Sequence, residues 1–329
     1  MSVTRFNEII GHDAVIERLK RDLAGRRVPH AYLFTGPQGV GKATVGELVC
    51  KAMSCLADDP VRRPCGDCIA CKKMLHLNHP DFHLVKLDKD KKQIRIDQIR
   101  QIQAELALKP YEAQWKTLLI DDADFLNESA QNALLKTLEE PPGDTLIILV
   151  CTSLRNLLPT IISRCRVERF APISTDKITS LLISKLGWKE KDALFASAVA
   201  NGSVGKALSL DIESLRVARE EIKKIIMELS VSNQSKAEKV VNAAEFFIKA
   251  GEEGIVILRM LLRDMAVLQA NSTRVINRDI EDELESIASN GSVEDIVKKF
   301  TATAEALERL NRNANKSLVY ESLALALVG

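Results

Sequence analysis

A glycine-rich stretch within the first fifty residues limits what this chain can fold into. Gly36, Gly39 and Gly41 lie in the run GPQGVGK, which ends at Lys42. An apolar segment at residues 31–35 precedes the run, and a helical pattern follows at residues 44–53. Between a strand and a helix, such glycines let backbone N–H groups converge on phosphate oxygens, and the lysine reaches the terminal phosphates. The sequence therefore predicts a phosphate-binding loop, against the alternative of a chance glycine turn.

Further short apolar segments predict the rest of a sheet. They lie at residues 82–87, 117–120, 145–151 and 167–170. Helical patterns at residues 94–108 and 131–140 alternate with them, and the second pattern stops at two prolines. This alternation predicts an α/β domain with a parallel five-stranded sheet that is covered by helices on both faces.

Strand patterns end at about residue 171, and only helical patterns follow. With 329 residues and 36.5 kDa, the chain exceeds the usual size of one domain. We expect an α/β domain over residues 1–171, an all-α lid over 172–210 and an all-α C-terminal domain over 211–329. In the last domain, helices are predicted at residues 236–250, 254–270 and 292–327, and their apolar stripes are expected to form mainly its core.

Two acidic residues, Asp121 and Asp122, end the apolar segment LLI. In a Walker B segment the first acid completes the Mg²⁺ shell and a following glutamate orients the attacking water. Asp122 is one methylene shorter than glutamate, so its carboxylate falls back by about 1.5 Å. The alternative interpretation is an acidic loop that caps the next helix, a task that residues 127–129 can perform.

The phosphate loop itself lacks one expected group. A P-loop carries Ser or Thr after its lysine, and that hydroxyl binds Mg²⁺. Here the position holds Ala43, and Thr44 lies about 100° further round the helix. We expect Mg²⁺ to be poorly held, and binding of ATP or ADP stays open.

Five of the seven cysteines fall between residues 50 and 71. Four of these five have spacings suited to one tetrahedral zinc ion: Cys55, Cys65, Cys68 and Cys71. Gly66 permits the tight turn that aims successive sulfurs at one metal. Because four protein ligands leave no open position, the predicted site is structural, in an insert at about residues 55–80. The alternative is a surface insert with free cysteines.

Composition excludes several classes of protein. Lys and Arg total 46 and Asp and Glu total 45, so a net charge of +1 excludes binding of nucleic acid by bulk charge alone. Aromatic residues are only 4%, which argues against a base-stacking platform. The N-terminus has no apolar core of a signal peptide, and no apolar run approaches the length of a membrane span. We therefore expect a soluble, cytoplasmic protein.

Three motifs in order resemble those of bacterial clamp-loader AAA+ proteins. They are GPQGVGK, then LLIDDADFLNESAQNALLKTLEEPP, then Ser163-Arg164-Cys165, with the four-cysteine insert between the first two. This combination is similar to the tau/gamma and delta-prime subunits of DNA polymerase III. The specific resemblance covers residues 1 to about 210, whereas residues 211–329 match by length, by helical character and by a terminal segment similar to a collar helix.

The delta-prime type is the better match, because the chain departs from an active ATPase at Ala43, Asp122 and Gly205. Gly205 stands where the ATPase subunits carry a sensor arginine. The resemblance implies a stator without autonomous activity, which lends Arg164 to ATP on a neighbouring subunit. A guanidinium is always charged and binds phosphate as a fork, as this role requires. The alternatives are an active tau/gamma-type ATPase and a free-standing zinc-containing DNA-binding protein.

The resemblance also implies partners. These are tau/gamma-type and delta-type subunits, primed DNA within the complex and, indirectly, the sliding clamp; no membrane is involved. The basic stretch at residues 86–100, above all Arg95 and Arg100, is the candidate for contact with DNA phosphates. A solvated loop and helix face is the equally weighted alternative.

Overall fold

The computed structural model describes residues 3–25, 27–88, 90–231, 235–272, 274–289, 291–312 and 314–328. The chain divides into two compact units. The first unit comprises Met1–Lys177 with Gly202–Gly205, and the second comprises Ile178–Asn201 with Lys206–Gly329. The expected division into an α/β domain, a lid and a C-terminal domain is finer than this one and remains a prediction.

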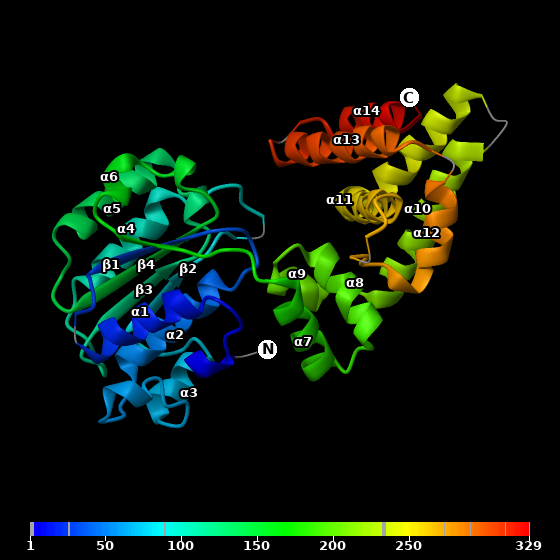
Figure 1. Cartoon of the computed structure of the whole chain (residues 1–329). Helices are drawn as coiled ribbons and strands as arrows, with labels where there is room; N and C mark the ends of the chain where they lie inside the picture. Colours follow the sequence, from blue (N-terminus) through cyan, green and yellow to red (C-terminus); the bar gives the residue numbers. More distant parts are fainter. Residues whose placement is uncertain are drawn as a thin grey trace. The chain divides into compact units, whose positions relative to one another are not determined.

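The first unit contains the predicted sheet of five parallel strands. The strands are β1 (Ala31–Thr35), β2 (Phe82–Val85), β3 (Lys116–Ile120), β4 (Thr145–Cys151) and β5 (Arg166–Arg169). Their order across the sheet is β2-β3-β4-β1-β5, and every neighbouring pair is parallel (Figure 1). All strands therefore end at the same edge, where the loops after β1, β3 and β4 meet. The predicted α/β class is confirmed.

Helices cover both faces of the sheet, because successive strand residues point to opposite sides. On one face lie α1 (Asp13–Ala24), α2 (Lys42–Ser54) and α3 (Ile69–Leu75), and the strand side chains packed there include Tyr32, Phe34, Leu119 and Ile148. On the other face lie α4 (Ile96–Leu106), α5 (Glu128–Glu139) and α6 (Pro159–Ile162), over Leu33, Leu118, Ile147 and Leu149 (Figure 1). Short 3₁₀ turns η1 (Phe6–Glu8), η2 (Pro60–Arg62), η3 (Ala123–Phe125) and η4 (Leu154–Asn156) link these elements.

The described part of the second unit is helical. Its elements are α8 (Glu190–Ala200), α10 (Ile212–Val231), α11 (Lys236–Gln269), η5 (Arg278–Ile280), α12 (Glu281–Ala288), α13 (Val293–Asn311) and α14 (Lys316–Val328). Two more helices, α7 (Thr175–Leu186) and α9 (Val204–Ser209), cross from one unit into the other. In no described helix is there an apolar stretch long enough to span a membrane.

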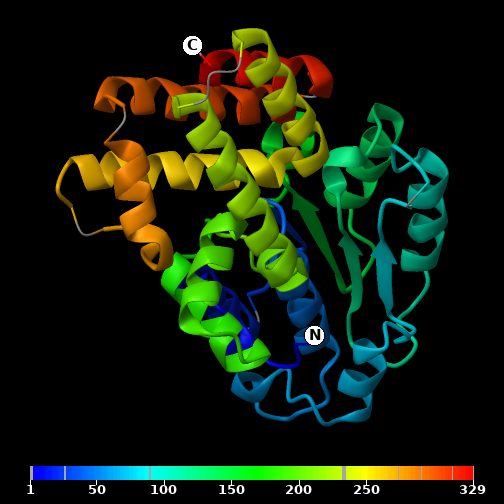
Figure 2. The same ribbon diagram turned by 90° about the vertical axis from the view of Figure 1, so that its right-hand side faces the viewer.

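Helix α11 forms the centre of the C-terminal helices. It contacts α10, α12, α13 and α14, and α13 and α14 run alongside it (Figure 2). The predicted apolar stripe is buried within this unit, as expected for core, at Ile255, Leu258, Leu261, Leu262 and Met265. The break predicted between helices at 236–250 and 254–270 is present within α11, because the backbone of Gly251 is not helical, with φ of 64°. The helix predicted at 292–327 is instead two helices, α13 and α14.

Candidate nucleotide and metal sites

The phosphate loop joins the end of β1 to the start of α2, as the sequence predicts. Gly36, Gly39 and Gly41 all have positive φ angles, of 151°, 73° and 103°. A Cβ atom at Gly36 would lie 2.1 Å from the carbonyl oxygen of Phe170, just beyond β5. Glycine is therefore required at position 36 by the close approach of a neighbouring strand end as well as by its own backbone angles.

Lys42 is fixed over this loop. Its Nζ donates to the carbonyl oxygens of Gly36 at 2.7 Å and Pro37 at 2.6 Å, and the residue is only 6% exposed. Burial lowers the pKa of its ammonium. The loop thus holds a preoriented cation at the N-terminus of α2, which is the arrangement that binds a phosphate group.

A histidine that the sequence did not single out supports the same loop. His12 has a left-handed backbone, with φ of 59°, immediately before α1. Its Nε2 lies 2.9 Å from the carbonyl oxygen of Val40, so the ring donates there when Nε2 carries the proton. Its ring also packs edge-on against Phe170 at 4.8 Å between centroids. Burial lowers the pKa of His12, which favours the neutral ring.

The predicted acids Asp121 and Asp122 lie after β3, at the same sheet edge as the loop. Asp121 accepts the backbone N–H of Asp122 at 3.1 Å. Burial, together with the negative charges of Asp121 and Asp124, raises the pKa of Asp122. Asn127 caps α5 by accepting the N–H of Ala130 at 2.9 Å. This is the capping that the alternative interpretation assigned to residues 127–129, and the assignment of Asp121 and Asp122 to a Walker B segment stays a prediction.

The third acid of this segment has a structural role that the sequence analysis missed. Asp124 accepts the backbone N–H and the hydroxyl of Thr152, the hydroxyl at 3.0 Å, and the N–H of Ser153 at 3.1 Å. These bonds tie the end of β3 to the end of β4 and place Thr152 at the sheet edge that carries the phosphate loop. The position of Thr152, a polar residue directly after a buried strand, was the feature of the sequence that could have indicated this role.

Gly205 lies directly against the phosphate loop. Its N–H donates to the carbonyl oxygen of Gly39 at 2.8 Å. A Cβ atom at Gly205 would lie 3.2 Å from both Cα and O of Gly39. Any side chain at position 205 therefore requires the loop or this backbone segment to shift by a few tenths of an ångström.

Arg164 follows α6 and is held at the surface. Its Nη2 lies 2.6 Å from Oε1 of Glu139 at the end of α5, and its Nη1 donates to the carbonyl oxygen of Thr160 at 2.8 Å. The side chain remains 34% exposed. Part of the guanidinium fork is therefore available to a further anion.

The structure brings the four predicted cysteines together. The sulfurs of Cys55, Cys65, Cys68 and Cys71 all lie within 4.8 Å of one another, and those of Cys65 and Cys71 are 3.9 Å apart. Tetrahedral zinc with bonds of about 2.3 Å sets its sulfurs about 3.8 Å apart, so this donor set fits the metal. The turn between the ligands uses Gly66 in a left-handed conformation, with φ of 87°.

Backbone amides also support these sulfurs. Cys55, Cys65 and Cys68 each accept one backbone N–H at 3.4 Å, from Cys65, Cys68 and Cys71 respectively. Burial opposes ionisation of Cys65, but the N–H groups of Cys68 and Asp67 and the neighbouring thiols lower its pKa to about 6. Such amides stabilise thiolates, which are the form that binds metal. The cluster can therefore hold a metal ion.

The protein has clear relatives among replication proteins. A family described as "DNA polymerase III, delta subunit" matches residues 11–174, and its C-terminal counterpart matches residues 219–328. The chain is 30% identical over 325 residues to the DNA polymerase III subunit delta' of Bacillus subtilis (strain 168), with 95% of each chain covered. This chain belongs to the delta' family of DNA polymerase III subunits.

Membership of the delta' family confirms the resemblance drawn from the sequence motifs. The chain is also 33% identical to the tau subunit of the same organism over 211 residues, which are 63% of this chain and 37% of tau. Among solved structures, a gamma subunit-related protein of Thermotoga maritima has 19% identity and a TM-score of 0.41, covering 94% of this chain and 97% of that chain.

Arg95 and Arg100, which the sequence offered for DNA contact in this delta' family chain, lie at the start of α4 and within it. Arg95 precedes the helix, and its backbone N–H donates to Oε1 of Gln98 at 3.1 Å. Both side chains are exposed and form no ion pair with another described residue. Lys89, from the same basic stretch, lies outside the described residues. The two arginines are thus available to an anionic partner.

Proposed function

We propose that this delta' family chain is a stator of the clamp loader that hydrolyses ATP weakly or not at all. It supplies Arg164 to ATP on a neighbouring subunit and helps load the sliding clamp onto primed DNA. The observation that carries the proposal is the close contact between Gly205 and Gly39, because a Cβ atom at position 205 would already lie 3.2 Å from the loop. A sensor arginine at this position would require the loop to shift by a few tenths of an ångström from its present position.

Two other positions support the same conclusion. Ala43 provides no hydroxyl for Mg²⁺, and Asp122, whose pKa is raised by burial, is shorter than the glutamate of an active site. Removal of one catalytic contact costs about 10²–10³-fold in rate. Several missing contacts at one centre leave little turnover, although their effects need not multiply fully.

The position of Arg164 suits action in trans. The guanidinium lies at the surface and is oriented by Glu139 and Thr160, with part of its fork free. A positively charged fork is stabilising where negative charge develops on a transferred phosphoryl group. In this proposal Arg164 is the residue through which the chain affects catalysis, and the ATP belongs to the neighbour.

We further propose that the cysteine cluster holds structural Zn²⁺. Cys55, Cys65, Cys68 and Cys71 would be its four ligands, and the ion would stabilise the fold of residues 55–80. The partners in this proposal are tau/gamma-type and delta-type subunits, with the clamp and primed DNA within the assembly. Arg95 and Arg100 are the proposed contacts with DNA phosphates, and the work takes place in the cytoplasm.

A reconstituted clamp loader tests the main proposal. Arg164→Ala should lower the ATPase activity of the complex while assembly, followed by size-exclusion chromatography, stays intact. Arg164→Lys keeps the charge without the fork, so the ATPase activity of its complex should lie between those of the wild-type and Arg164→Ala complexes. Arg312→Ala, which removes another exposed arginine, serves as the matched control. An unchanged ATPase activity in the Arg164→Ala complex would refute the trans role.

An active tau/gamma-type ATPase is the second candidate, and Lys42 favours it. The lysine is buried and oriented by two loop carbonyls, as binding of a terminal phosphate requires. Steady-state ATP hydrolysis by the isolated chain, abolished by Lys42→Ala, would support this candidate. Absence of turnover by the pure protein supports the stator.

A further inference from the structure

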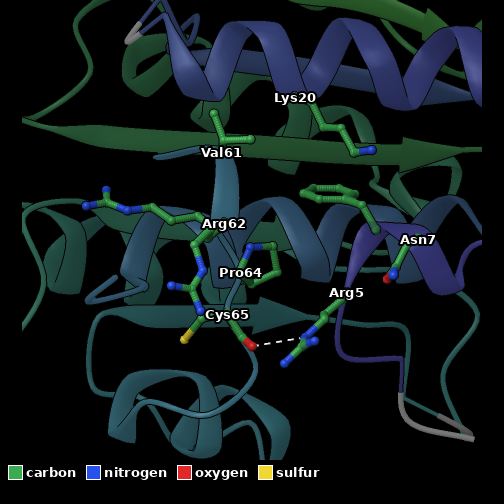
Figure 3. A pocket seen from close by; sticks show the side chains of 9 residues that line it. Arg5, Asn7, Lys20, Val61, Arg62, Pro64 and Cys65 are labelled. Carbon is green, nitrogen blue, oxygen red and sulfur yellow. Dashed lines mark hydrogen bonds between the residues drawn. The ribbon is translucent and has the colours of Figure 1, made fainter. Parts of the chain in front are cut away.

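A basic cavity lies beside the cysteine cluster, and no residue of the phosphate loop lines it. Its volume is about 240 Å³, and it lies between the start of the chain, α1 and the η2 turn of the insert (Figure 3). Nine residues line it: Arg5, Phe6, Asn7, Lys20, Val61, Arg62, Arg63, Pro64 and Cys65. Four of these are cations and none is an acid. A cavity with this lining is suited to an anion.

Two of the four cations have little to compensate their charge. Arg62 forms no ion pair or hydrogen bond through its side chain with another described residue, and Lys20 has only the exposed i−3 partner Glu17 at 3.3 Å. Arg63 uses Nε to donate to the carbonyl oxygen of Ala57 at 2.7 Å, which leaves its two terminal nitrogens. Among the residues that the structure describes, only Arg5 of these four has a closer acid, Asp67 at 3.0 Å.

A second basic cavity on the other flank of α1 differs in this respect. It is lined by Arg18, Arg21, Asp22, Gly25, Arg27 and Arg166. Two of its arginines are already neutralised, because Arg18 pairs with Glu168 at 2.6 Å and Arg166 pairs with Asp22 at 2.9 Å. The cavity beside the insert, which has no acid in its lining, therefore has the larger excess of positive charge.

We propose that the cavity lined by Arg5, Lys20, Arg62 and Arg63 binds the phosphate backbone of a nucleic acid strand. Arginine forks match phosphate oxygens, and the chain places three arginines and one lysine around one opening. The only aromatic residue of the lining, Phe6, is 5% exposed, so no ring is presented for base stacking. Binding is therefore independent of sequence and depends on charge.

The apolar part of the lining fits the same ligand. Val61 is 80% exposed. Pro64 lies next to Cys65, whose carbonyl oxygen accepts a hydrogen bond from Arg5 (Figure 3). Such walls pack against a sugar while the cations contact the phosphates on either side. This contact lies on α1 and the insert, so it is separate from the proposed contact through Arg95 and Arg100 on α4.

A purely structural reason for the cations predicts different behaviour. Four thiolates around Zn²⁺ carry a net charge of −2, and nearby arginines would stabilise that charge. Arg5 does so in part, because its Nε donates to the carbonyl oxygen of Cys65 at 3.0 Å. Lys20 and Arg62 form no hydrogen bond with the cysteines of the cluster, which makes them the informative residues for a test.

The test uses the full-length, zinc-loaded chain and fluorescein-labelled DNA, both as a single strand and as a duplex of mixed sequence. Fluorescence anisotropy gives the affinity between 50 and 200 mM salt for the wild type and for the double variant Lys20→Ala/Arg62→Ala. A matched double variant, Lys185→Ala/Lys316→Ala, removes two exposed lysines elsewhere. Zinc content is measured for each protein.

We expect Lys20→Ala/Arg62→Ala to lower the affinity for DNA several-fold. The slope of log affinity against log salt should become shallower by about 1.4 for the single strand and about 1.8 for the duplex, because each of the two lost phosphate contacts contributes about 0.7 or 0.9. Zinc content and the matched variant should be unchanged. An unchanged affinity and slope, or loss of zinc without loss of DNA binding, would each overturn the proposal.

Discussion

Arg164 is restrained but not buried, which bears on how it can act. Its partner Glu139 is half exposed, and exposed ion pairs contribute only about 0–1 kcal/mol to stability. The pair can therefore orient the guanidinium without opposing its approach to a more strongly charged phosphate. Glu139 is then a positioning residue for the proposed arginine finger.

Glu139→Gln tests this positioning role. The amide keeps the size of the side chain but removes the charge, so we expect a several-fold lower kcat of the reconstituted complex with little change in KM. The free energy of unfolding of the isolated chain, measured by urea denaturation, should change by no more than about 1 kcal/mol. A large loss of stability with unchanged kcat would instead show that the pair only holds α5 and α6 together.

Asp81 is a buried residue whose two carboxylate oxygens both accept hydrogen bonds. It is 1% exposed and accepts the backbone N–H groups of Tyr111, Glu112 and Ala113 at 2.6–2.8 Å. Burial alone would raise the pKa of this carboxyl, but the three N–H donors lower it overall. Because this pKa is lower in the folded state than in the unfolded state, the carboxylate adds stability at pH values above the ordinary pKa of a carboxyl group. That stability is lost as the pH falls through the pKa of the folded state.

Asp81→Asn should therefore cost about 1–3 kcal/mol at pH 7, since one accepting oxygen and the charge are lost. The difference from wild type should shrink when urea unfolding is repeated at pH 4 and below. Asp144→Asn, at an exposed carboxyl, is the matched control. A difference that stays constant with pH would contradict the role given to the ionised carboxylate.

At the scale of elements, continuous apolar runs were the most reliable guide. The strands β1 and β4 have the predicted bounds, because both are buried along their whole length and their pattern is unbroken. The strand predicted at 82–87 ends at Val85, and the helix predicted from residue 94 begins at Ile96. Ile94 instead forms a bridge with Leu126, a pairing between distant segments that no local pattern contains.

Whether a part of the site could be predicted depended on how far apart its residues lie in the sequence. The phosphate loop and the four cysteines follow from spacings within a short segment. The contacts of Gly205 with Gly39, of His12 with Val40 and of Thr152 with Asp124 join residues far apart in the chain. Helix α1 was not predicted either, and it is this helix that carries His12 at its start and Lys20 at the basic cavity.

The cysteine insert is the element whose stability we expect to depend on metal. Cys71→Ser should abolish binding of one zinc equivalent and unfold the segment around α3, because a site with three ligands no longer compensates the ordering of the loop. The sheet should remain folded, since α1 and α2 supply most of the side chains that cover the face of the sheet on which α3 lies, and α3 supplies Met74. Zinc content together with hydrogen exchange by mass spectrometry measures both effects, and Cys50→Ser, at a buried cysteine outside the cluster, is the control. Full zinc retention in Cys71→Ser would contradict the four-ligand site.

At the scale of the whole molecule, a net charge of +1 conceals local fields of opposite sign. The basic cavity at α1 and the exposed arginines of α4 belong to the same chain as the acidic edge formed by Asp121, Asp122 and Asp124. A subunit that shares its DNA contacts with partners needs only local positive charge. The same sharing applies to catalysis, in which the proposed function divides nucleotide and arginine between two chains.

This division can be measured by comparing two variants in the same reconstituted complex. Lys42→Ala changes the chain's own phosphate loop, and we expect the ATPase activity of the complex to stay within about twofold of wild type, because the degenerate centre contributes no turnover. Arg164→Ala should instead silence the neighbouring site, where loss of an arginine finger costs about 10³-fold or more. Single-turnover measurements with ATP identify how many sites remain active. If Lys42→Ala removed as much activity as Arg164→Ala, the chain would be an ATPase in its own right, and the stator role would be wrong.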